Sequence, residues 1–267
     1  MAGIMVFAGT GPGQEASSLA RVNWFRCVQE RPLAPLRLFC FPHAGGSAVF
    51  YRTWADALGP AVELRTVQYP GRADRMGDPF ITDADELARQ VAAAMEPLLD
   101  RPAALFGHSM GAVLAYEVAR LLEERGTPPV HLFASGARPP HDREDERIAE
   151  RDDDGLVEKL AELGGTDVEI FQHEEMRELV LPYVRNDFAL IEGYRHRPEP
   201  RLRTPVTVLL GDSDPHVDRD VAERWREVTD GEPFQVRSWP GDHFYLVPRK
   251  SEVTAEVLRI LRVPAGP

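Results

Sequence analysis

Cysteine is scarce in this sequence, because Cys27 and Cys40 are the only two among 267 residues. Two cysteines are too few for a disulfide framework or for a four-ligand zinc site. Cys40 lies within an apolar segment, where a thiol packs as a small hydrophobic side chain. The cysteines therefore predict neither a disulfide scaffold nor a metal centre.

Long apolar runs are also missing. None approaches the roughly 18–20 residues that a membrane-spanning helix needs. The segment Met1–Ala20 has no basic start followed by an apolar core, which a secretory signal would show. These two absences predict a soluble, cytoplasmic protein.

Positive charge is in deficit, since 31 Lys and Arg face 43 Asp and Glu, for a formal net charge of −12. Binding to nucleic acid needs a basic stripe that meets the phosphates, and the sequence shows none. An acidic protein partner would be repelled unless a local basic patch received it.

What is present is an alternation of apolar segments and amphipathic segments over a chain that is 43% hydrophobic. This length and composition favour one α/β domain over residues 21–267, after a poorly ordered tail at residues 1–20. Strands followed by helices predict a mostly parallel central sheet flanked by helices. The expected strands are 36–41, 63–69, 103–106, 130–134, 205–210 and 234–239, and the expected helices include those starting near 83, 110, 218 and 252.

The stretch with the most chemical information is Gly107-His108-Ser109-Met110-Gly111. It follows a short apolar run and precedes a helical pattern, which is the strand–turn–helix context of the G-x-S-x-G nucleophile elbow. Such a turn strains the backbone of its central residue and needs glycine where neighbours pack closely. Ser109 is therefore the candidate nucleophile, at a helix N-terminus that favours developing negative charge.

A second glycine-rich loop, Pro42-His43-Ala44-Gly45-Gly46-Ser47, follows the predicted strand 36–41. An ordinary glycine turn is the alternative interpretation of this loop. Together with the elbow it predicts an oxyanion hole, formed by the backbone N–H of Ala44 and that of Met110, the residue after the nucleophile.

A serine nucleophile needs an imidazole to take its proton and a carboxylate to orient that imidazole. His243 follows the last predicted strand, and Asp214 lies in the loop after the strand 205–210. The chain order Ser109, Asp214, His243 is that of α/β-hydrolases. Asp212 and Asp242 are the competing acids. This chemistry requires no cofactor, and the remaining histidines show no metal-ligand spacing.

Residues from about 141 to 203 interrupt the alternation. Helical patterns are expected at Leu156–Leu163, Glu174–Val180 and Tyr183–Tyr194, with Pro182 breaking the last two apart. An insertion of this length between nucleophile and acid predicts a lid over the active site, mobile from about Leu156 to Tyr194. The alternative is an appendage on the far side of the molecule.

Five segments together resemble the type II thioesterases of modular polyketide and nonribosomal peptide assembly lines. They are Phe41–Ala48, Tyr69–Arg72, Gly107–Gly111, Gly211–Asp214 and Gly241–Leu246, and the likeness runs from about Leu36 to Leu261. The resemblance implies an α/β-hydrolase that removes aberrant or stalled acyl groups from the phosphopantetheine arm of acyl or peptidyl carrier domains. It also supports Asp214 as the acid. Asp242, where the family often has a second glycine, and the long N-terminal tail are departures.

The resemblance and the need for a local basic patch together single out Arg72 and Arg75 as carrier-docking residues, although two arginines in a loop can simply be solvated. Two other functions compete with the thioesterase hypothesis. A carboxylesterase or lipase would act on small free esters, and a carrier-binding module would keep the triad without using it.

Overall fold

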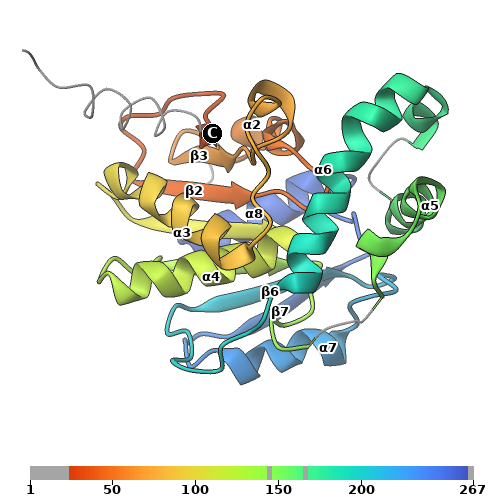
Figure 1. Ribbon diagram of the computed structural model, residues 1–267. Coiled ribbons are helices and arrows are strands. Elements are labelled where there is room, and N and C mark those ends of the chain that lie inside the picture. Colours follow the sequence, from red (N-terminus) through yellow and green to blue (C-terminus); the bar gives the residue numbers. More distant parts are fainter. Residues whose placement is uncertain (1–23, 143–145, 165–167, 264–267) are drawn as a thin grey trace, which may run out of the picture.

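The computed structural model describes residues 24–142, 146–164 and 168–263 (Figure 1). The tail predicted at residues 1–20 lies outside the described residues. Seven strands form one sheet in the order β1-β3-β2-β4-β5-β6-β7. They are β1 (Phe25–Arg26), β2 (Leu36–Phe41), β3 (Val62–Val67), β4 (Ala103–His108), β5 (His131–Ser135), β6 (Val206–Gly211) and β7 (Gln235–Trp239).

Every neighbouring pair in this sheet is parallel except β1 with β3. All residues of β2, β4, β5 and β6 are buried. Strands buried on both faces read as continuous apolar runs, which is why the sequence pattern located them. The predicted, mostly parallel sheet is therefore confirmed.

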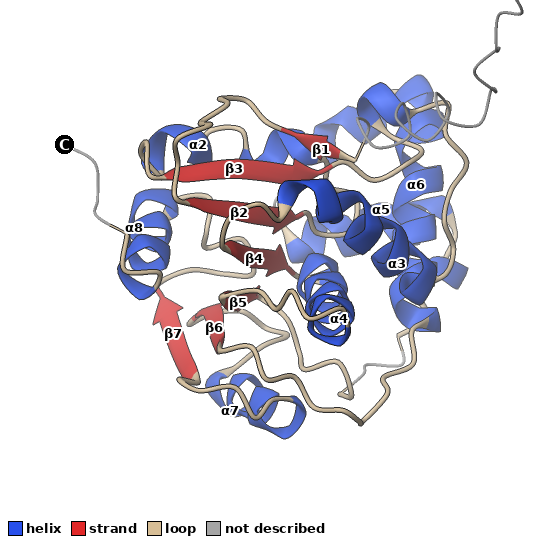
Figure 2. Ribbon diagram, turned by 90° about the vertical axis from the view of Figure 1, so that its left-hand side faces the viewer, coloured by secondary structure: helices blue, strands red, loops and turns tan. Residues whose placement is uncertain are grey.

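Helices cover both faces of the sheet, as Figure 2 shows. On one face lie α3 (Ala84–Met95), α4 (Met110–Glu124) and α7 (Arg219–Glu223), whose apolar residues join the largest core cluster. On the other face lie α2 (Trp54–Ala57) and α8 (Lys250–Ile260) over a second core. The α3 helix begins as predicted, because the side chain of Asp83 accepts the Glu86 N–H.

The insertion between β5 and β6 contains α5 (Asp153–Leu163) and α6 (Glu174–Gly193), which pack around a third, smaller core. The predicted break at Pro182 is wrong, since α6 runs through it. A proline removes one helical hydrogen bond. Leu181 and Val184 beside it are buried in the small core, and their packing offsets that loss.

Short elements were the ones that the sequence pattern missed, notably β1 and α2. The helix expected from Asp218 to Val228 is α7 followed by a 3-10 turn. The 3-10 helices are Ala48–Tyr51, Ala73–Arg75, Glu96–Leu98, Ile148–Glu150, Val168–Gln172 and Arg224–Val228. Within the described ranges, no helix has the length and apolar character to cross a membrane.

Candidate active site

Ser109 lies in a strained turn between β4 and α4. Its backbone angles are φ 54° and ψ −123°, a conformation that L-residues rarely adopt. A Cβ on Gly107 would collide with the carbonyl of Gly111, and one on Gly111 would collide with the carbonyl of Phe41. The two glycines are therefore required for this turn, as the motif predicts.

His243 and Asp214 form a buried hydrogen-bonded pair. The Nδ1 atom of His243 lies 2.8 Å from Asp214 Oδ2, and the His216 N–H donates to Asp214 Oδ1 over 2.9 Å. The competing acids are engaged elsewhere. Asp212 accepts the Gly241 N–H and the Ser213 hydroxyl, and Asp242 accepts the Phe244 N–H. Of the three acids, Asp214 is the one placed to orient the imidazole.

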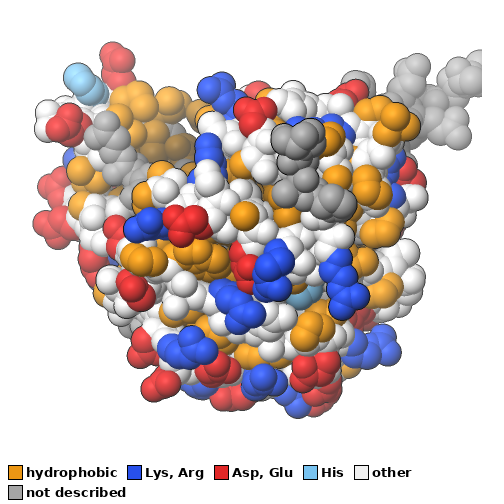
Figure 3. Space-filling view, turned by 180° about the vertical axis from the view of Figure 1, so that it is seen from behind, with side chains coloured by type: hydrophobic (Ala, Val, Ile, Leu, Met, Phe, Trp, Pro, Cys, Tyr) orange, Lys and Arg blue, Asp and Glu red, His pale blue; other side chains and the backbone are white. Residues whose placement is uncertain are grey.

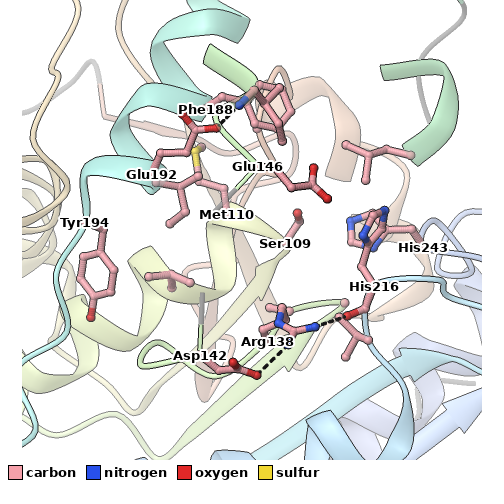
Figure 4. A pocket seen from close by; sticks show the side chains of 18 of the residues that line it. Ser109, Met110, Arg138, Asp142, Glu146, Phe188, Glu192, Tyr194, His216 and His243 are labelled. Atoms are coloured by element: carbon pink, nitrogen blue, oxygen red, sulfur yellow. Dashed lines mark hydrogen bonds and ion pairs between the residues drawn. The ribbon is translucent and has the colours of Figure 1, made fainter. Parts of the chain in front are cut away.

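A cavity of about 190 Å³ has both Ser109 and His243 in its wall (Figure 4). The Nε2 atom of His243 is buried and forms no hydrogen bond with the described residues. It is the nitrogen left free to take the proton of Ser109. The described residues show no hydrogen bond between this nitrogen and Ser109 Oγ, and catalytic hydrogen bonds of this kind often tighten only in the substrate complex.

The two expected oxyanion donors border the same cavity. Met110 is the first residue of α4, so its N–H has no partner within the helix. Among the residues that the structure describes, neither the Ala44 N–H nor the Met110 N–H has a hydrogen-bond acceptor. Both are available to a substrate oxygen.

Two further imidazoles lie near His243 without lining the cavity. The His108 ring centroid is 5.0 Å from that of His243, and the rings of His43 and His108 are 5.9 Å apart. Burial, with the charges of His243 and Arg72, lowers the pKa of His43 to about 3, and burial also lowers the pKa of His108 well below its usual value. Near neutral pH both rings are uncharged and serve as packing.

The cavity wall also contains charged side chains that sequence reasoning did not find. They are Arg138, Asp142, Glu146, Lys159 and Glu192. Lys159, on α5, is buried and pairs with Glu146 at 2.8 Å. These residues lie in or next to the insertion, where no motif marked them.

The apolar residues of the insertion pack in different places. Leu163 and Phe188 border the cavity. Leu160, Phe171 and Leu181 pack within the small core of the insertion. Leu190 belongs to the main core, and Leu179 is 46% exposed.

The docking role expected for Arg72 is contradicted by its burial, whereas Arg75 is only partly buried and its docking role stays a prediction. Arg72 is 2% exposed and pairs with Asp187 of α6, so it cannot meet a partner's surface. The Arg75 side chain is 10% exposed, donates to Asp78 and to the Gln68 carbonyl, and lies over the Trp24 ring. On the face seen in Figure 3, basic and acidic side chains are interspersed.

Comparisons with known proteins agree on one family. The family model described as "Thioesterase domain" matches residues 36–262. "Thioesterase PikA5" of Streptomyces venezuelae is 40% identical over 245 residues, 91% of this chain and 87% of that protein. The "Probable cadicidin biosynthesis thioesterase" of Streptomyces griseus is 41% identical over 90% of this chain, which spans 66% of that protein's length.

A solved structure gives the same result. The "type II thioesterase BorB from the borrelidin biosynthetic cluster" superposes with a TM-score of 0.81 at 38% identity. The match covers 88% of this chain and 96% of the other.

Proposed function

This chain belongs to the thioesterase family, and from that premise we propose that it acts in trans on carrier proteins of a biosynthetic assembly line. Its substrates are aberrant or stalled acyl groups held as thioesters on the phosphopantetheine arm. The observation that carries the proposal is the buried Asp214–His243 pair, whose imidazole lines the same cavity as the strained Ser109.

The first half of the reaction is acyl transfer to the enzyme. His243 Nε2 takes the proton of Ser109 Oγ as the oxygen attacks the thioester carbonyl carbon. The negative charge passes to the carbonyl oxygen, where the N–H groups of Ala44 and Met110 stabilise it. The carbon–sulfur bond then breaks, and the imidazolium returns its proton to the leaving thiol of the arm.

The second half releases the acyl group. A water molecule gives a proton to His243 Nε2 and attacks the Ser109 ester, and the same N–H groups receive the oxyanion again. The C–O bond to the serine breaks, and the proton returns to Ser109 Oγ. Asp214 keeps the imidazole in the required tautomer and stabilises its cation throughout.

The test is a comparison of one acyl series in three forms: on a carrier protein, on coenzyme A and as a simple ester. We expect the highest kcat/KM for the carrier form, and no turnover of any form by Ser109→Ala. Equal or faster hydrolysis of the simple esters would favour a carboxylesterase or lipase.

A serine-directed phosphonate identifies the nucleophile independently. Mass spectrometry of the digested adduct is expected to find the label on the peptide containing Ser109. Label on another residue would contradict the assignment. Carrier binding by a protein that neither hydrolyses nor takes the label would favour a carrier-binding module.

A further inference from the structure

The insertion helix α6 contacts the loop that carries the oxyanion donor Ala44. Asp187 lies in the second half of α6, and its Oδ2 atom accepts the N–H of Gly45 over 2.8 Å. Val184, almost one turn earlier, also faces this loop, since a Cβ on Gly45 would be 3.1 Å from Val184 Cγ2. The loop is therefore held from the lid side.

Arg72 completes this contact from the loop after β3. Its Nη2 donates to Asp187 Oδ1 over 2.6 Å, and its Nη1 donates both to Asp187 Oδ2 and to the Gly46 carbonyl. The guanidinium lies 5.3 Å from the Tyr69 ring centroid and 4.7 Å from that of Tyr183. Arg72 and Asp187 are each 2% exposed, so the pair is shielded from water.

These bonds act on the Ala44–Gly45 and Gly46–Ser47 peptide units of the loop. Asp187 fixes the N–H of Gly45 and Arg72 fixes the carbonyl of Gly46, at a point where Gly45 has φ +77° and could otherwise vary. The Ala44 N–H belongs to the preceding His43–Ala44 peptide unit. Fixing the Ala44–Gly45 unit on the other side of Ala44 restricts the backbone angles that give this N–H its direction. An apolar contact could not do this, because a buried N–H needs an acceptor.

We propose that Asp187, neutralised by Arg72, is a positioning residue that aligns the oxyanion hole and makes this alignment depend on the position of α6. The inference rests on the proposed thioesterase function. It explains why the sequence places an arginine after Tyr69-Pro70-Gly71 and an aspartate 115 residues later on the insertion.

Two double variants distinguish a positioning role of Asp187 from a contribution of the Arg72–Asp187 pair to the stability of the fold. In the amide pair, Arg72→Gln with Asp187→Asn, the asparagine oxygen can still accept the Gly45 N–H. In the apolar pair, Arg72→Met with Asp187→Leu, no acceptor remains. Both remove the buried charges together, which avoids leaving one charge unpaired.

We expect the apolar pair to fold but to lose about tenfold or more in kcat with little change in KM, because a misaligned donor affects mainly the transition state. Phosphonate labelling of Ser109 should slow in parallel. The amide pair should keep most of the wild-type kcat. Equal kcat in two folded double variants would overturn the proposal.

The control removes a buried pair of the same kind far from the site. Arg37 and Glu63 pair at 2.6 Å near the amino ends of β2 and β3, opposite the catalytic edge. Arg37→Met with Glu63→Leu should change the thermal unfolding midpoint and leave kcat unchanged. A similar loss of kcat in this control would show that removing any buried ion pair lowers kcat. That result would contradict a positioning role for Asp187.

If the apolar pair does not fold, Arg72→Lys supplies the test. Lysine keeps the positive charge, yet a point charge cannot hold both Asp187 oxygens and the Gly46 carbonyl. A folded Arg72→Lys variant with reduced kcat and wild-type KM supports the proposal, and one with wild-type kcat opposes it. A wild-type enzyme that hydrolyses neither carrier-bound nor simple thioesters would instead reject the proposed function.

Discussion

At the scale of single residues, the acid of the triad is distinguished by what each carboxylate already binds. Both oxygens of Asp214 are used, one by His243 and one by the backbone N–H of His216. This holds the carboxylate rigidly behind the imidazole. Asp212 lies two residues earlier in the same loop but is exposed and binds Gly241 instead.

Asp214→Asn is therefore expected to reduce turnover by roughly 10⁴-fold, the loss that the same change causes in serine proteases. The asparagine amide would stabilise the wrong imidazole tautomer and would not balance the imidazolium charge. Steady-state hydrolysis of a simple thioester measures the effect. Asp212→Asn is the matched control and should stay near wild-type activity. The reverse ranking would show that the acid is misassigned.

At the scale of secondary-structure elements, the two helices of the insertion are attached differently. Besides the Asp187 contacts, α6 is tied to the domain by Asn186, which donates to the Ile81 carbonyl, and by Tyr194 at its C-terminal end, whose hydroxyl donates to Glu117 of α4. The main contacts of α5 are with α6 and the 3-10 turns of the insertion. We therefore expect α5, rather than α6, to be the movable part of the predicted lid.

Hydrogen-exchange mass spectrometry should resolve this difference. We expect fast amide exchange in α5 and slow exchange in residues 184–193 of α6, because local opening is easiest where few contacts join an element to the core. This expectation is narrower than the mobility predicted for all of Leu156–Tyr194, and the same measurement distinguishes the two. A long-chain phosphonate on Ser109 should slow exchange in α5. Equal protection of both helices, unchanged by the adduct, would contradict a lid role for α5.

At the scale of the whole molecule, several histidines are folded into the interior in the uncharged state. Burial lowers the pKa of His131 on β5 to about 4, and its Nε2 lies 2.8 Å from Thr207 Oγ1 in the neighbouring strand. In the unfolded chain a histidine binds a proton near pH 6.5. As the pH falls below that value, protons therefore bind the unfolded chain first.

The stability that His131 contributes is fully present above about pH 6.5 and is lost as the pH falls toward about 4. We expect the free energy of unfolding to fall across this window, with His131 accounting for up to about 1.4 kcal/mol per pH unit. Urea unfolding of the wild type and His131→Gln at several pH values measures the slope. His131→Gln should flatten it, whereas the exposed control His173→Gln should not. Identical slopes in all three proteins would refute the assignment.

The sequence by itself determined those features that depend on residues close together along the chain. The bounds of β2 were predicted to the residue, because five of its six consecutive buried positions are apolar. The strained turn at Ser109 follows from glycines two residues away on either side. The order of Ser109, Asp214 and His243 was visible as well, because each follows a strand whose end lies at the same edge of the sheet.

Only the tertiary structure decided which distant groups meet. Nothing local to Arg72 shows that its partner lies 115 residues away on the insertion, so a loop arginine was interpreted as exposed when it is buried. The continuity of α6 through Pro182 likewise depends on packing of Leu181 and Val184 that the helix alone does not contain. Such contacts form because the fold brings segments together that are far apart in the sequence. Their energy comes from burial and pairing between those segments, which no short stretch of sequence contains.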